Sequence, residues 1–170
     1  MKIVLSVVAG IALLLPLVDG AGHSATVGVK NAKGETLGSL TLTEVKEGVW
    51  IRGALTGLPP GSHGFHVHQN AQCVGPDFKS AGPHFNPGHK EHGDLNPLGG
   101  HAGDLANLMV SMQGSGSVNI LAKGLTIQAG PNSLMQPGGT SVVIHALADD
   151  RLSDPAGNSG DRIACGSIGQ

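Results

Sequence analysis

The side chains in this sequence best suited to chemistry are six histidines and one aspartate that lie between positions 66 and 145. They are His66, His68, His84, His92, His101, Asp104 and His145. Histidine is the commonest metal ligand in proteins and binds through a neutral imidazole nitrogen. Protein sites for ions such as zinc hold about four ligands, so seven candidates are too many for one ion. The number of candidate ligands therefore favours two adjacent metal ions.

The segment Gly64-Phe65-His66-Val67-His68 carries two of these histidines at positions i and i+2. Side chains with this spacing point the same way on a β-strand, because a strand repeats every second residue. Taken alone, such a pair is more often a packing or surface feature than a metal site. The downstream histidines and Asp104 make metal binding the better interpretation. Because they lie in glycine- and proline-rich sequence, a loop must fold back to bring them to the strand.

Short segments that alternate apolar and polar residues predict an all-β structure. The gap from Gln69 to Asp104 has no strand pattern, and a loop of that length in a compact domain needs something to order it. The candidate metal ligands and Cys73 in this segment can do so. No segment has a sustained helical period. The expected strands are Ser24–Lys30, Thr36–Glu44, Val49–Leu55, His63–His68, Leu105–Met112, Ser117–Ala122, Thr140–Leu147 and a short one near Ile163–Ile168.

Four motifs together resemble the copper/zinc superoxide dismutase family, in particular its exported bacterial members. They are the segments 64–68, 81–87 (Ala-Gly-Pro-His-Phe-Asn-Pro), 101–105 (His-Ala-Gly-Asp-Leu) and 157–166 (Gly-Asn-Ser-Gly-Asp-Arg-Ile-Ala-Cys-Gly). The match begins at about residue 25 and continues to the C-terminus. It implies a Greek-key β-sandwich, or flattened eight-stranded antiparallel barrel, with long metal-binding loops. Residues 23–170 would form this single domain.

The resemblance also implies a role for individual residues. It gives one copper and one zinc ion per subunit, with His84 as a ligand that bridges both. Asp149 would link a copper ligand to a zinc ligand, Arg162 would attract the superoxide anion, and Cys73 and Cys165 would form a disulfide. The implied copper ligands are His66, His68, His84 and His145, and the implied zinc ligands are His84, His92, His101 and Asp104.

The activity implied by the resemblance is the conversion of two superoxide radicals into dioxygen and hydrogen peroxide, with Arg162 and His84 as the catalytic residues. Two other classes of function compete with it: a copper-delivery or metal-storage protein built on the same domain, and a purely structural secreted sandwich. The complete copper-ligand set and the presence of Arg162 argue against the first, and the seven candidate ligands argue against the second. Alone, His145 would be a core histidine and Arg162 a surface arginine. Outside the ligand set, we interpret His63 as structural and His89 as a solvated loop residue, and His23 as a weak candidate for an accessory metal site.

Composition narrows the classes of partner and the compartment. The net charge is −2, and the chain lacks basic runs and aromatic platforms, so nucleic-acid binding is not expected. Met1-Lys2, the apolar run from Ile3 to Val18 and the small residues at 20–22 predict a secretory signal peptide over residues 1–22. An uncleaved anchor is the alternative. The two cysteines suit an oxidising compartment, so the predicted location is periplasmic or extracellular, without stable membrane association after cleavage.

Two segments depart from the eukaryotic members of the family. The stretch from His145 to Arg162 is short and rich in aspartate, so Lys79 or Lys90 is the candidate for a lysine that steers the substrate. The stretch from Cys73 to His84 is enlarged by residues 74–79. This enlargement does not support a dimer interface of the eukaryotic type, although a homodimer remains open.

Overall fold

The computed structural model describes residues 22–169, which form nine strands and one short 3-10 turn. The predicted signal peptide at 1–22 therefore lies almost entirely outside the described residues. The strands are β1 (Ser24–Asn31), β2 (Thr36–Val45), β3 (Gly48–Thr56), β4 (Gly61–His63), β5 (Phe65–His68), β6 (Leu108–Val110), β7 (Ser115–Lys123), β8 (Thr140–His145) and β9 (Arg162–Ile168), and the turn η1 is Lys79–Ala81.

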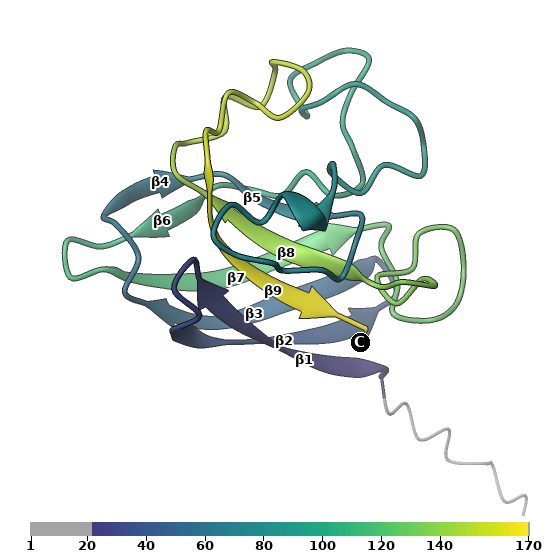
Figure 1. The fold of residues 1–170 in the computed structure, drawn as a ribbon. Coiled ribbons are helices and arrows are strands. Elements are labelled where there is room, and N and C mark those ends of the chain that lie inside the picture. Colours follow the sequence, from purple (N-terminus) through teal and green to yellow (C-terminus); the bar gives the residue numbers. More distant parts are fainter. Residues whose placement is uncertain (1–21, 170) are drawn as a thin grey trace, which may run out of the picture.

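All strand pairs are antiparallel, and the strand order is β4-β6-β7-β3-β2-β1-β9-β8-β5. The strands at the two ends of this order, β4 and β5, are neighbours in sequence that only Gly64 separates. The sheet must therefore curve until its two ends meet, which gives the nearly closed barrel of Figure 1. The all-β antiparallel barrel predicted from the sequence is confirmed.

Two of the predicted strands differ in detail from the structure. The segment His63–His68 is divided at Gly64, so nine strands are present where eight were expected. The two halves are separate strands because they have different partners: β4 pairs with β6, whereas β5 pairs with β8. The predicted strand Leu105–Met112 is shortened to Leu108–Val110, because residues just before it turn toward the segment after β8.

The core of the barrel consists of aliphatic side chains and a few aromatic ones from the inward-facing positions. In β1, Val27 and Val29 are buried, whereas the residues between and beside them are exposed. This is the period-two pattern of a sheet with one face in solvent. Strands β5 and β8 differ, because every residue in both is buried. Something must therefore cover their outer face as well.

Two long loops provide that cover. Residues 146–161 and the later part of 69–107 lie above β5 and β8 in the view of Figure 1, and the part of 69–107 around η1 lies in front of β8 and β9. The region from Gln69 to Asp104 contains no strand, as predicted, and only the turn η1 is regular. Within residues 22–169 the chain has no helix with the length and hydrophobicity needed to cross a bilayer.

Candidate metal centre

Strands β5 and β8 present histidines to the loop side of the barrel. Phe65 and Val67 belong to the barrel core, so His66 and His68, which alternate with them, face the other way. In β8, Ile144 likewise belongs to the core, and His145 follows it. The strand pairing thus places three histidines on one surface before any loop residue arrives.

The loop 69–107 returns to the free edge of β5 and binds it through the backbone. Val67 donates its N–H to the carbonyl of Gly103 at 2.9 Å and accepts the N–H of Phe85 at 2.8 Å. Gly103 is required for this approach, because a Cβ at that position would lie 2.3 Å from the oxygen of Val67. These contacts bring His84 beside His68 and Asp104 beside His66.

The first cluster consists of four buried histidines whose nitrogens converge. His68 and His145 direct Nδ1 at the carbonyls of Gly82 and Gly160, at 2.9 and 3.1 Å. A ring nitrogen that donates to a carbonyl carries the hydrogen, so Nε2 of each neutral ring has a lone pair. Those two Nε2 atoms are only 3.4 Å apart, a contact between lone pairs that a cation would relieve. The four members are His66, His68, His84 and His145, with ligand atoms within 4.8 Å of one another.

The second cluster gathers around one oxygen of Asp104. Oδ1 lies 2.9 Å from Nδ1 of His84 and 3.1 Å from Nδ1 of both His92 and His101. The other oxygen, Oδ2, accepts backbone N–H groups from Gly93 at 2.8 Å and His101 at 2.9 Å, which fixes the carboxylate. His84, His92, His101 and Asp104 therefore form a compact set of three nitrogens and one oxygen.

Asp149 links the two clusters, because its carboxylate contacts one histidine of each. Its carboxylate oxygens lie 2.7 Å from Nε2 of His66 and 3.0 Å from Nε2 of His92. Each ring must therefore use Nδ1 toward its own cluster. A Cβ at Gly157 would lie 1.8 Å from Asp149 Oδ1, and its φ of +62° also favours glycine, so the loop 146–161 can close here only with glycine.

Burial sets the protonation state of these groups. It lowers the pKa of His84 to about 4 and that of His145 to about 3, and it lowers the pKa of His68 strongly. Burial opposes ionisation of Asp104, but hydrogen bonds from His101 and His84 outweigh it and lower the pKa of the carboxyl. Near neutral pH His68, His84 and His145 are therefore neutral and Asp104 is charged, which is the state that binds a cation.

Three ring nitrogens in the two clusters make no hydrogen bond, although Nδ1 of His92 lies 3.1 Å from Oδ1 of Asp104. Nδ1 of His66, Nε2 of His84 and Nδ1 of His92 are buried and make no hydrogen bond. Buried nitrogens are normally satisfied, so each of these atoms calls for an explanation. Two metal ions would satisfy all three. Four imidazoles suit copper, and three histidines with one carboxylate suit a closed zinc site.

Arg162 lies at the start of β9, directly opposite His145 in the β8–β9 ladder. Its terminal nitrogens Nη1 and Nη2 donate to the carbonyls of Phe78 at 2.8 Å and Gly82 at 2.7 Å. Burial lowers its pKa, but a guanidinium remains charged in proteins. A fixed positive charge thus lies next to the four-histidine cluster.

Comparison with known proteins agrees with this geometry. The family model described as copper/zinc superoxide dismutase matches residues 36–168. A copper-zinc superoxide dismutase of Aquifex aeolicus is 44% identical over 170 residues, which is 99% of each chain. The chain belongs to the copper/zinc superoxide dismutase family.

Solved structures from the family have the same fold. A superoxide dismutase-like protein from Bacillus subtilis superposes with a TM-score of 0.82 at 40% identity, covering 84% of this chain and 97% of that one. The copper/zinc superoxide dismutase from Brucella abortus has a TM-score of 0.70 at 31% identity, covering 86% of this chain and 99% of that one. Copper and zinc are the metals of this family, and the two clusters fit them.

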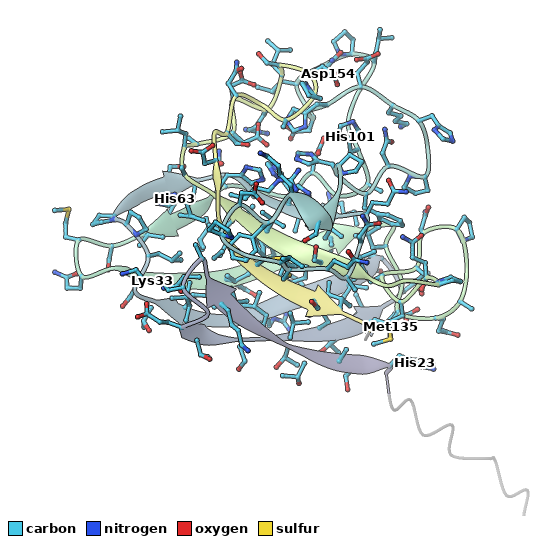
Figure 2. The ribbon with its side chains drawn as sticks, in the orientation of Figure 1. His23, Lys33, His63, His101, Met135 and Asp154 are labelled. Carbon is cyan, nitrogen blue, oxygen red and sulfur yellow. A yellow bond between two sulfur atoms is a disulfide. The ribbon has the colours of Figure 1, made fainter. Side chains whose placement is uncertain are left out.

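Every site residue expected from the resemblance to the dismutase family lies in or beside this centre. The Cys73–Cys165 disulfide is confirmed. The two ring nitrogens of His63 lie 2.8 Å from backbone carbonyls, those of His145 and Pro59, as expected of a structural residue. His89 is exposed, and Figure 2 places His23 on the far side of the molecule from His101.

The two candidate steering lysines of this dismutase-family chain differ in position. Lys79 is exposed and lines the same pocket as Arg162, together with Asp77 and Asp161, and forms an ion pair with Asp77 at 3.2 Å. Lys90 instead lines a groove with Trp50 and His101, beside the second cluster. Lys79 is therefore the candidate lysine that lies beside Arg162.

Sequence reasoning missed two residues that position the centre. Asn107 accepts the N–H of Asp149 and donates to its carbonyl, both at 2.9 Å, and so clamps the residue that joins the clusters. The carbonyl of Phe78 holds Arg162. Asn107 follows the 101–105 motif by only two residues, but neither of these contacts has a pattern in the sequence that could predict it.

Proposed function

We propose that this chain is a superoxide dismutase that converts two superoxide radicals into dioxygen and hydrogen peroxide. The observation that carries the proposal is a pair of four-ligand clusters that share His84, with a half-buried arginine beside one of them. We assign copper to His66, His68, His84 and His145, and zinc to His84, His92, His101 and Asp104, with one ion of each kind per subunit.

The chemistry of the donors supports this assignment. Copper at the four-imidazole cluster would supply one-electron redox chemistry by alternating between Cu(II) and Cu(I). A carboxylate among three histidines is a closed set typical of zinc, which has no redox chemistry. Asp104 keeps its charge at neutral pH, so it can hold a dication in place and fix the loop that carries His84.

His84 and Arg162 act on the substrate in this proposal. His84 has Nδ1 on the Asp104 side and Nε2 on the other side, so Nε2 can carry a proton to the reduced substrate while Nδ1 remains in place. Arg162 supplies a positive charge that attracts the small superoxide anion to the cluster. Lys79 adds a second positive charge in the pocket that Arg162 lines, and the carboxylates of Asp77 and Asp161 partly offset it.

We further propose that residues 1–22 direct export and that the mature chain acts in the periplasm or outside the cell. The disulfide supports an oxidising compartment. After cleavage the chain would have no stable membrane association and no nucleic-acid partner. Sedimentation of the purified chain distinguishes a monomer from a homodimer.

A superoxide assay with defined metal content tests the proposed activity. The purified chain is prepared with copper and zinc, with zinc alone and with copper alone, and superoxide decay is followed by pulse radiolysis. We expect rapid decay in both copper-containing forms and only the background rate with zinc alone. Stable binding of both metals without faster decay would refute the activity and favour a role in copper delivery or storage.

A further inference from the structure

The guanidinium of Arg162 is held by a single segment of the chain. Both of its acceptors, the carbonyls of Phe78 and Gly82, lie in the enlarged stretch between Cys73 and His84. The contacts use one N–H from each terminal nitrogen, and an arginine has five such donors. The other N–H groups remain available to an anion, in an orientation that the two carbonyls fix.

The backbone of Phe78 has an unusual conformation. Its φ and ψ are 51° and 23°, in the left-handed region, which is rare for a bulky residue other than glycine. Strained conformations of this kind persist only where surrounding structure imposes them, and they concentrate at functional sites. Here the conformation begins the turn η1, and the same carbonyl accepts the N–H of Ala81 at 3.0 Å and Nη1 of Arg162 at 2.8 Å.

The ring of Phe78 explains how this conformation is maintained. It is 2% exposed and forms a small apolar cluster with Ala81, Val143 and Cys165, against which Cys73 also packs. Val143 is two residues before His145, and Cys165 is three residues after Arg162. The ring therefore anchors the enlarged loop on the two strands that carry the histidine ligand and the guanidinium.

We propose that Phe78 is the positioning residue for Arg162: its buried ring fixes the loop, and its left-handed backbone aims the carbonyl at Nη1. This inference rests on the proposed role of Arg162 as the guide for an anionic substrate. A residue that only filled space would affect stability alone. A positioning residue must also control the order of the guanidinium and the affinity for anions.

The test compares Phe78→Ala with the conservative variant Phe78→Leu and with Val118→Ala. Val118 is buried in β7, in the main core, so its truncation lowers stability without touching the loop. The first readout is the heteronuclear ¹⁵N NOE of the Arg162 Nε–H group in the copper-free, zinc-loaded protein. The second is the dissociation constant of azide, an anionic probe, measured optically on the protein loaded with copper and zinc.

We expect the Arg162 Nε–H group of the wild type to be as ordered as the backbone of β9. Phe78→Ala should lower its NOE and weaken azide binding about 3–10-fold at unchanged copper content, and Phe78→Leu should restore most of both. Val118→Ala should change neither, despite its lower melting temperature. An NOE and azide affinity in Phe78→Ala equal to those of the wild type would overturn the proposal.

The wild-type measurement keeps the proposal falsifiable if Phe78→Ala does not fold. A mobile Arg162 side chain in the wild type would refute positioning without any variant. The NOE also separates this inference from the proposed activity, because it requires neither copper nor turnover. An inactive wild type with an ordered, Phe78-dependent Arg162 would refute the activity alone.

Discussion

Asp149 is the residue through which the two clusters depend on each other. Its carboxylate contacts one histidine from each cluster, and its own backbone is clamped by Asn107. Burial opposes its ionisation, but hydrogen bonds from His66 and His92 prevail and lower the pKa of the carboxyl to about 2. Asp149 therefore orients both rings over the whole physiological pH range.

We expect Asp149→Ala to weaken zinc binding about 10–100-fold, which is the usual cost of removing a group that orients a metal ligand. The reason is that Nε2 of His92 loses its acceptor and the ring can rotate. Asp149→Asn keeps the size and one acceptor oxygen, so it should lose less. Competition with a chromophoric zinc chelator measures both, and equal affinities in all three proteins would contradict the role of Asp149.

Arg162 allows a prediction about the sign of the charge. Arg162→Glu should retain both metals and slow superoxide decay by about one to three orders of magnitude, because reversing a charge at a partly desolvated site costs several kcal/mol. Arg162→Lys should lose less, since the charge remains but cannot bind both carbonyls in one plane. The rates are compared at matched copper content. If all three were equal, Arg162 would have no guidance role.

At the scale of secondary-structure elements, β5 and β8 determine which residues of the barrel can reach the site. One face of each strand belongs to the barrel core and the other to the metal loops, so the period of two determines which residues can be ligands. The sequence was sufficient to predict this, because His66, Val67 and His68 alternate within an apolar strand. It was also sufficient to predict that the segment after β5 has no strands.

Other features of the elements could not be predicted from one sequence. The division of a strand at Gly64 depends on partners that lie far away in the chain, β6 for one half and β8 for the other. The hydrogen bonds from Asn107 to Asp149 and from Arg162 to the carbonyl of Phe78 both end on backbone atoms. Only the folded loops determine where those atoms lie. Side-chain type predicted the ligands, whereas the residues that orient them required the structure.

The loop 69–107 is expected to depend on its metal for order. Asp104→Ala should remove zinc and increase amide hydrogen exchange across this loop, because metal binding supplies its folding free energy. The control is Asp94→Ala, which removes the same charge from the same loop at an exposed site outside both clusters. Exchange rates in Asp104→Ala no faster than in the control would contradict the assignment of Asp104.

At the scale of the whole molecule, the buried histidines link stability to pH. In the metal-free chain, burial lowers the pKa of His84 to about 4 and of His145 to about 3, below the value of about 6.5 for an unfolded histidine. The unfolded chain therefore binds protons first as the pH falls, and the folded state loses stability. His101 opposes this trend, because its hydrogen bond with Asp104 outweighs burial and raises its pKa.

We accordingly expect the melting temperature of the metal-free chain to fall between pH 7 and pH 4. The loss of folding free energy that His84 alone causes would reach roughly 3 kcal/mol below about pH 4, because its pKa is lower in the folded than in the unfolded chain. Differential scanning calorimetry across this range measures the effect. A melting temperature that stays constant or rises on acidification would show that His84 and His145 do not set the stability of the metal-free chain.

We expect two different metals to occupy the two clusters and to share His84. X-ray diffraction of crystals of the active, metal-loaded chain, with data collected on both sides of the copper and zinc absorption edges, tests it most directly. We predict a copper peak among His66, His68, His84 and His145 and a zinc peak beside Asp104, with His84 between the two. A single metal peak, or copper at the Asp104 cluster in active protein, would contradict this account.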